Sequence, residues 1–308
     1  MDIISIEHLQ KGFKGREVLR AVTFSVKKGE VFGFLGPNGA GKTTTMRCLL
    51  GLLRPDGGTA TVFGEDLARS DGLRRKVGVL LENDGLSDRL TARDNLDYHA
   101  RLYGVQERER RIEEILEFIG LSDRQNSLVG TYSTGMRRKL GIGRSILHTP
   151  EVLFLDEPTS GLDPEAQRMV RDLILELSRE EEMTVFINSH NLDEVQRVCS
   201  SVGILHDGRL RAFDRIERLR EDGGGRVRIV LTDPPSAEEA LRTLTAMPGI
   251  GPADRDGEEV TVHLEGTGVP AIVRTLVEKG CAIEEVVQER RSLEEIYLSV
   301  VRQAEGSA

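Results

Sequence analysis

The start of the chain carries short apolar runs separated by polar turns. Apolar residues alternate or run together at residues 3–9, 22–26 and 31–35, and segments rich in glycine and charge lie between these runs. Such runs, bounded by turn-like breaks, are typical of strands. The pattern predicts edge strands that lead into a buried core strand.

The middle of the chain alternates between helical and strand patterns. From about residue 91 to residue 148 the pattern is helical throughout. One helix face there is marked by Ile112, Ile115, Leu116 and Ile119. Strands are predicted at residues 59–64, 76–81, 151–156, 184–188, 202–205 and 209–213, and helices after Lys42, at Asp163-Pro164 and after His190. This predicts an α/β fold of the P-loop type, with a mixed sheet core, an antiparallel β edge and an inserted helical subdomain.

The pattern of apolar and polar positions is interrupted at residues 220–226, "REDGGGR", where glycines and charges predict a linker. Beyond it, strands are predicted at residues 226–231, 259–264 and 282–288, and helices from Ser236, from about Val269 and from Ser292. Ser236 and Ser292 are each followed three residues later by Glu, as in a capping box. We expect a first domain at 1–220 and a small ferredoxin-like α+β accessory domain at 226–304.

Composition narrows the class of protein. The 308 residues are 38% apolar, enough for a buried core, and the formal net charge of −9 argues against a dedicated nucleic-acid binder. Cys48, Cys199 and Cys281 lie far apart, as expected in a reduced compartment without a zinc site. The N-terminal segment has an acidic residue where a signal peptide usually has basic residues. No apolar run approaches the roughly 18 residues that a membrane span needs. We expect a cytoplasmic chain that reaches a membrane only through another chain.

Residues 36–44, "GPNGAGKTT", match the phosphate-binding pattern G-x-x-x-x-G-K-[ST] between a predicted strand and a predicted helix. Glycines let the backbone wrap a phosphate, while Lys42 is expected to reach the β- and γ-phosphates and Thr43 to bind Mg²⁺. The alternative is a glycine-rich turn with a solvated lysine. The nucleotide-binding candidates in this loop are Gly36, Pro37, Asn38, Gly39, Ala40, Gly41, Lys42, Thr43 and Thr44.

Four apolar residues, 152–155, lead directly into Asp156 and Glu157. A buried strand that ends in two acids at the phosphate edge puts Asp156 where it can hold Mg²⁺, directly or through water, and Glu157 where it can polarise water. The alternative is that both acids are helix caps, since many parallel strands end in such residues.

These motifs resemble those of the ATP-binding subunit of an ATP-binding cassette (ABC) transporter, over roughly residues 1–220. The motifs occur in the family's order: an aromatic residue, Phe13; the Walker A loop at 36–44; the signature at 132–136; Walker B with Glu157; a D-loop ending at Asp163; and a switch histidine, His190.

The resemblance implies a role for each motif. Phe13 would stack on adenine, Glu157 would be the general base for the attacking water, and His190 would orient that water and sense the γ-phosphate. Taken alone, Phe13 favours core packing and His190 a surface helix cap. The residues implied to serve ATP held by a second copy are Ser133, Thr134, Gly135 and Met136 of the signature, together with Asp163, which also caps a helix.

Two positions depart from the commonest family pattern. Glu82 stands where the family usually has Gln, and we expect it to join Thr43 and Asp156 as a magnesium ligand, although it adds negative charge near the triphosphate. The signature is "YSTGM" rather than "LSGGQ"; this relaxed form and "SLEEIYLSV" at 292–300 resemble the branch that exports drugs, lipids or other hydrophobic compounds. The basic run at 136–139 is interpreted as a solvated helix start, the alternative being that one of its arginines contacts phosphate.

The resemblance therefore implies a motor. Two copies would bind two ATP with Mg²⁺, close on each other and drive export through a separate multispan permease, so the chain would lie at the inner face of the cell membrane without binding nucleic acid. One alternative is a soluble ABC ATPase that acts on DNA or the ribosome, although such relatives usually carry two cassettes, a long coiled-coil insertion or zinc modules. A P-loop GTPase or kinase is another, but the chain lacks an N-K-x-D base-reading motif.

Overall fold

The computed structural model describes residues 1–180, 182–221, 225–289 and 291–306. The chain divides into two compact units: the first is Met1–Asp214 together with the chain from Gln303 on, and the second is Arg215–Arg302. The predicted linker at 220–226 includes residues 222–224, which lie outside the described residues. The division falls earlier because helix α8 (Ile216–Glu221) belongs to the second unit, where Nε of Arg220 donates to the carbonyl oxygen of Arg291. The limits 1–220 and 226–304 remain predictions.

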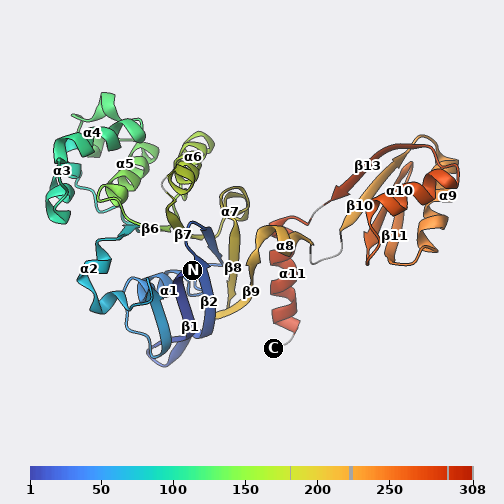
Figure 1. The fold of residues 1–308 in the computed structure, drawn as a ribbon, viewed down its shortest axis with the longest axis horizontal. Helices are drawn as coiled ribbons and strands as arrows, with labels where there is room; N and C mark the ends of the chain where they lie inside the picture. Colours follow the sequence, from blue (N-terminus) through green and yellow to red (C-terminus); the bar gives the residue numbers. More distant parts are fainter. Residues whose placement is uncertain (181, 222–224, 290, 307–308) are drawn as a thin grey trace. The chain divides into compact units, whose positions relative to one another are not determined.

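The first unit contains two sheets (Figure 1). The smaller is antiparallel, in the order β2 (Arg16–Lys27), β1 (Asp2–Phe13) and β4 (Gly57–Val62). The larger has the order β5 (Val77–Leu80), β6 (Val152–Asp156), β7 (Thr184–Ser189), β3 (Val31–Leu35), β8 (Ser201–His206) and β9 (Arg209–Arg215). Strands β5, β6, β7, β3 and β8 are parallel. The predicted mixed sheet with an antiparallel edge is confirmed, and the edge forms a sheet of its own.

Aromatic side chains join the two sheets. The ring of Phe24 in β2 lies 5.2 Å from the ring of Phe32 and 5.2 Å from that of Phe34, both in β3. The ring of Phe186 in β7 lies 5.2 Å from that of Phe32. Each such pair stabilises by about 0.5–1.5 kcal/mol beyond the apolar area that it buries. This packing fixes β3, β6 and β7, whose carboxyl ends carry the predicted site, within one rigid core.

Three helices gather in one cluster in the first unit (Figure 1). They are α3 (Ala92–Tyr103), α4 (Arg108–Phe118) and α5 (Thr134–Ile146), which pack on one another. Helix α3 begins with a capping box between Thr91 and Asp94. Gly143 permits the close approach of α5 to α4, because a Cβ there would lie 2.8 Å from a side-chain carbon of Ile115. The predicted helical insertion is confirmed.

The remaining helices of the first unit connect its strands. They are α1 (Lys42–Leu49), α2 (Asp71–Arg74), α6 (Pro164–Glu180) and α7 (Leu192–Val198), with one-turn helices η1 (Leu67–Arg69), η2 (Ser122–Arg124) and η3 (Val129–Thr131). Throughout the part of the chain that the structure describes, no helix has the length and apolar character needed to cross a membrane.

The second unit has the order β10 (Arg226–Leu231), α9 (Pro234–Thr245), β11 (Ile250–Asp256), β12 (Glu259–Leu264), α10 (Val269–Glu278) and β13 (Ile283–Glu289), followed by α11 (Leu293–Gly306). Its antiparallel sheet has the order β11, β12, β10, β13. This β-α-β-β-α-β succession is that of the ferredoxin-like fold.

Two local expectations in this unit were wrong. Asp233, not Ser236, is the N-cap of α9: its carboxylate accepts from the backbone N–H of Ser236 at 2.8 Å, so the helix begins earlier. Strand β11 was missed because it contains Pro252 and lacks a buried face; both are tolerated at the edge of a sheet. The capping box at Ser292 is confirmed, since Ser292 and Glu295 exchange side-chain to backbone hydrogen bonds.

Candidate nucleotide-binding and catalytic site

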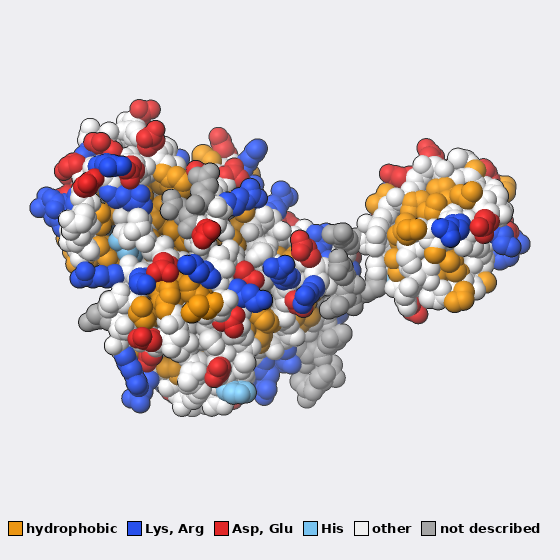
Figure 2. Space-filling model, viewed as in Figure 1, with side chains coloured by type: hydrophobic (Ala, Val, Ile, Leu, Met, Phe, Trp, Pro, Cys, Tyr) orange, Lys and Arg blue, Asp and Glu red, His pale blue; other side chains and the backbone are white. Residues whose placement is uncertain are grey.

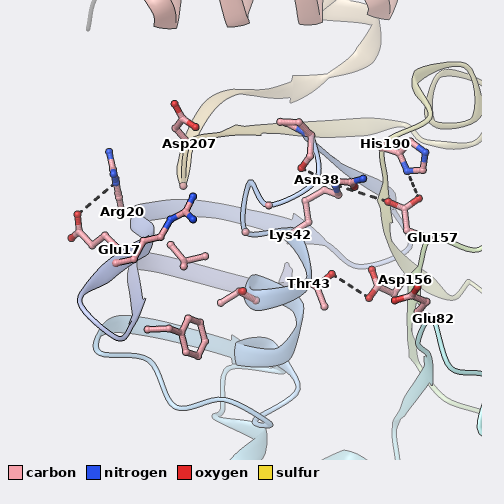
Figure 3. Close-up of a pocket in the computed structure, with 18 of the residues that line it drawn as sticks. Glu17, Arg20, Asn38, Lys42, Thr43, Glu82, Asp156, Glu157, His190 and Asp207 are labelled. Atoms are coloured by element: carbon pink, nitrogen blue, oxygen red, sulfur yellow. Dashed lines mark hydrogen bonds and ion pairs between the residues drawn. The ribbon is translucent and has the colours of Figure 1, made fainter.

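A pocket of about 700 Å³ lies in the first unit where the parallel strands end (Figure 3). Most of the residues predicted for a nucleotide in the same chain meet there. The pocket is lined by Phe13, Pro37, Asn38, Gly39, Gly41, Lys42, Thr43, Thr44, Glu82, Asp156, Glu157 and His190. Gly36 and Ala40 are buried behind the loop rather than in the lining.

The glycine-rich loop curls around the side chain of Lys42. Nζ of Lys42 donates to the carbonyl oxygens of Gly36, at 2.6 Å, and Pro37, at 3.3 Å, and lies 3.9 Å from Oε1 of Glu157. Gly41 has a φ of 112°, and a Cβ there would lie 2.6 Å from Cδ2 of Leu19, so this position requires glycine. Burial lowers the pKa of Lys42, while Glu157 and Asp156 oppose that shift. The solvated-lysine alternative is wrong, because the ammonium lies inside the pocket.

Oxygen atoms gather at the end of β6. Asp156 is buried; its Oδ1 accepts a hydrogen bond from Nδ2 of Asn188 at 3.0 Å, and its Oδ2 one from Oγ1 of Thr43 at 3.4 Å. Glu82 lines the same pocket from the loop after β5 (Figure 3). Among the described residues, no three His, Cys, Asp or Glu side chains are grouped so as to hold a metal ion by themselves. Hydroxyl and carboxylate oxygens nevertheless suit Mg²⁺, which usually keeps waters and takes further ligands from phosphate.

Glu157 and His190 face each other across neighbouring strands. Nδ1 of His190 lies 2.8 Å from Oε2 of Glu157, and the backbone N–H of Glu157 donates to the carbonyl oxygen of Asn188. Neither Asp156 nor Glu157 caps a helix. The next helix, α6, begins at Pro164 and is capped by Asp163, whose Oδ1 accepts a hydrogen bond from the N–H of Ala166. Nor does His190 cap a helix, since Asn191 is the N-cap of α7. The helix-cap alternatives for these residues are wrong.

Phe13 also lines the pocket. Its side chain is 44% exposed, so the core-packing alternative is wrong. Nζ of Lys11 lies 5.4 Å from the ring centre, on one face of the ring. A partly exposed aromatic ring beside Val18 offers a flat apolar surface for a base.

The signature residues, 132–136, are not part of the lining of this pocket. Ser133 is exposed and is the N-cap of α5, where its hydroxyl oxygen accepts from the N–H of Met136 at 3.3 Å. In the described part of the chain, the lining of the pocket does not include Ser133, Thr134, Gly135, Met136 or Asp163. The signature residues and Asp163 are thus not brought to the nucleotide pocket of their own chain, whereas Ser160, the first residue of the D-loop (160–163), does line that pocket.

Two polar residues of the site were not singled out from the sequence. Asn188 orients Asp156, and the polar end of an apolar strand was the available signal. Arg138 lines the pocket and is half-buried. The interpretation of residues 136–139 as a solvated helix start is therefore wrong for Arg138.

Comparisons with known proteins agree with one another. The family model described as "ABC transporter" matches residues 19–160. The ABC transporter ATP-binding protein YhcH of Bacillus subtilis is 34% identical, over 97% of this chain and 95% of its own length. The daunorubicin/doxorubicin resistance ATP-binding protein DrrA of Streptomyces peucetius is 39% identical, over 80% of this chain and 76% of its own length. A solved ATP-binding subunit of an ABC transporter superposes with a TM-score of 0.63 at 32% identity, covering 71% of this chain and 92% of that one.

Proposed function

The chain belongs to the ATP-binding subunits of the ABC transporter family, and we propose that it is the motor of an export system whose permease is a separate chain. The observation that carries the proposal is the meeting of Lys42, Glu157 and His190 in one pocket at the ends of three parallel strands. Subunits of this family are ATPases, and these side chains are those that phosphoryl transfer to water needs.

In the proposed reaction each side chain has one task. The ammonium of Lys42 binds phosphate oxygens of ATP and gives up its contacts with the loop carbonyls and Glu157. The carboxylate of Glu157 accepts a proton from the attacking water, a contribution of about 10²- to 10⁴-fold in rate. His190 holds Glu157 in place through Nδ1 and directs its other ring nitrogen to the terminal phosphate. Phe13 stacks on the base.

Thr43, Asp156 and Glu82 are the residues that would hold Mg²⁺. Their oxygens suit a hard cation, and Asn188 keeps one oxygen of Asp156 oriented. When bound, the ion supplies positive charge that neutralises phosphate oxygens. Glu82 also repels the triphosphate when the ion is absent, so we expect it to make nucleotide binding more dependent on magnesium.

A second copy of the chain completes the site in this proposal. Ser133 and Thr134, at the start of α5, are exposed and do not line the pocket of their own chain, so in this proposal they bind the terminal phosphate of ATP in a partner. Asp163 caps α6 at the same kind of exposed helix start. Hydrolysis would then require the dimer.

The permease would dock on the cluster of helices α3, α4 and α5. Tyr98 and Leu102 lie one turn apart on α3 and are 61% and 67% exposed, which supports an apolar contact with a membrane partner. The drug-resistance function in the name of the Streptomyces relative supports export. On the face shown in Figure 2, basic and acidic side chains are interspersed, which gives no support to the nucleic-acid alternative.

The experiment is purification of the tagged chain from detergent-solubilised membranes, with ATP hydrolysis measured on the purified material. We expect a multispan protein to co-purify and Lys42→Ala to abolish nucleotide binding. Co-sedimentation with ribosomes or DNA at moderate salt, without a membrane partner, would overturn the transport proposal.

A further inference from the structure

Within the described part of the chain, Arg138 is a cation of the nucleotide pocket without a direct acidic partner. It lies on α5, is half-buried and lines the pocket together with Glu82 and Asp156. Its hydrogen bond from Nη1 to the carbonyl oxygen of Leu81 is long, at 3.5 Å. A guanidinium has five N–H donors, so most of its hydrogen-bonding capacity is not taken up by the described residues.

Several carboxylates surround Arg138, but among the described residues none forms an ion pair with it. Burial lowers the pKa of Arg138, and the carboxylates of Asp84, Asp156, Glu82 and Glu194 oppose that shift. No carboxylate of the described residues lies within 4.0 Å of the guanidinium. The neighbouring Arg137 differs, because it is paired directly with Asp84 and Asp88. Arg138 is thus held in an acidic environment while its donors remain available.

Packing of α5 fixes the position of Arg138. One turn and a half later on the helix, Nη2 of Arg144 donates to the carbonyl oxygen of Val79 at 2.8 Å. Between them, Gly141 lets the helix approach the end of β5: a Cβ there would lie 2.9 Å from Cδ1 of Leu80. These contacts keep α5 against β5 and the loop that carries Glu82, so the guanidinium is positioned before any ligand arrives.

Arg138 and Ser133 lie on different sides of the same helix. At about 100° per residue, five residues turn through about 140° around the helix axis. This explains why Arg138 lines the pocket of its own chain while Ser133 does not. Helix α5 therefore presents Arg138 to the nucleotide pocket of its own chain and Ser133 to a surface outside that pocket.

We propose that Arg138 binds the terminal phosphate of the nucleotide held by its own chain, and that Glu82 is its counter-charge when no nucleotide is bound. The inference rests on the proposed function, since it assumes that the pocket takes a nucleoside triphosphate. Arg138 lines the pocket together with Glu82 and Asp156, the residues proposed to hold Mg²⁺, so it would lie near the terminal phosphates. Binding of phosphate would then bear directly on the helix whose start presents Ser133 to a partner.

The test is equilibrium binding of ATP and of ADP to the full chain, with EDTA present so that magnesium ligation by Glu82 plays no part. Arg138→Gln should weaken ATP binding by about tenfold and ADP binding much less, because a hydrogen bond between charged groups is lost at the terminal phosphate. Lys139→Gln is the matched control: it removes the same charge from the same helix outside the pocket, and should change neither affinity by more than about twofold.

Glu82 provides an independent arm. Glu82→Gln should strengthen ATP binding in EDTA, and the double variant with Arg138→Gln should return toward wild type, since each change removes one charge of opposite sign. Should Arg138→Gln fold poorly, Arg138→Lys is the second variant: it keeps the charge but loses the planar set of donors, so it should still weaken ATP binding more than ADP binding.

The outcomes separate the two proposals. Equal weakening of ATP and ADP by Arg138→Gln, wild-type affinity in that variant, or no effect of Glu82→Gln would overturn the role of Arg138 while leaving the ATPase intact. Absence of nucleotide binding in the wild-type chain would instead overturn the proposed function.

Discussion

Nδ1 of His190 lies 2.8 Å from Oε2 of Glu157, at the ends of the neighbouring strands β7 and β6. The contact spans 33 residues of sequence and depends on the register that pairs Asp156 with Asn188. It holds the carboxylate 3.9 Å from Nζ of Lys42. The proposed base, its orienting histidine and the phosphate-binding lysine therefore form one connected group.

The first prediction concerns Glu157. Glu157→Gln should keep ATP affinity near wild type and lower turnover by about 10²- to 10⁴-fold, because the amide cannot accept the proton of the attacking water. Phosphate release and size-exclusion chromatography with ATP measure this, and we expect a stable dimer. Glu165→Gln, an exposed carboxylate on α6, is the control. Hydrolysis at the wild-type rate in Glu157→Gln would show that another group is the base.

The second prediction concerns Asp156. Asp156→Asn should not weaken ATP binding in EDTA, because it removes a negative charge near the triphosphate, and should raise the magnesium concentration needed for half-maximal effect by about tenfold or more. The reason is that Asp156 offers carboxylate oxygens held by Asn188 and Thr43, and an amide is a weaker ligand. A magnesium titration of ATP affinity is the measurement. If the requirement for magnesium does not change, Asp156 is not a ligand.

The sequence was most informative where a motif lies within a regular element. The phosphate-binding loop follows β3 and opens α1, and both elements were predictable from apolar spacing and glycine positions. The closeness of Glu157 and His190 followed only from the family resemblance, because no local pattern relates residues on two strands.

What could not be predicted depends on packing between elements. The side of α5 that faces the pocket is set by contacts of Arg144 and Gly141 with β5, so three adjacent basic residues in the sequence give no hint that Arg138 differs from the others. Strand β11 has no alternating apolar pattern, because its alternating half-buried positions 251, 253 and 255 are Gly, Ala and Arg. The cap of α9 was misplaced because Asp233 and Ser236 are both good capping residues.

The third prediction concerns pH and Glu194. Burial raises the pKa of Glu194 above its ordinary value of 4.5; hydrogen bonds from Thr159 and Ser189 oppose this shift and Glu157 adds to it. Its Oε1 has no hydrogen-bond partner in the described structure. Below about pH 4.5 the folded and unfolded states are both protonated at this group, so the burial costs nothing. As the pH rises above that value the unfolded state releases its proton first, and the folded state loses stability.

Glu194→Gln should therefore raise the free energy of unfolding by about 1 kcal/mol at pH 7 to 8. The gain should disappear as the pH falls toward 4.5, with a slope of at most about 1.4 kcal/mol per pH unit. Thermal unfolding of both proteins across this range measures it. An equal difference at every pH would mean that the substitution acts through packing rather than through charge.

The fourth prediction concerns Ser133. Ser133→Arg should leave ATP binding to the isolated chain nearly intact, because Ser133 does not line its own pocket, and should abolish hydrolysis if the hydroxyl serves a partner's ATP. Binding and phosphate release on the same preparation measure the two effects. Equal loss of both would mean that the start of α5 serves its own chain.

Mixing two inactive variants gives a sharper test of the same point. Lys42→Ala cannot bind ATP in its own pocket, and Ser133→Arg cannot complete a partner's pocket. In a mixed dimer, the nucleotide held by Lys42 of the Ser133→Arg chain faces the intact Ser133 of the Lys42→Ala chain, so one of the two sites is whole. We therefore expect mixing to restore part of the activity that neither variant has alone. If Ser133 acted within its own chain, every site in the mixture would carry a defect, and activity would stay absent at all mixing ratios.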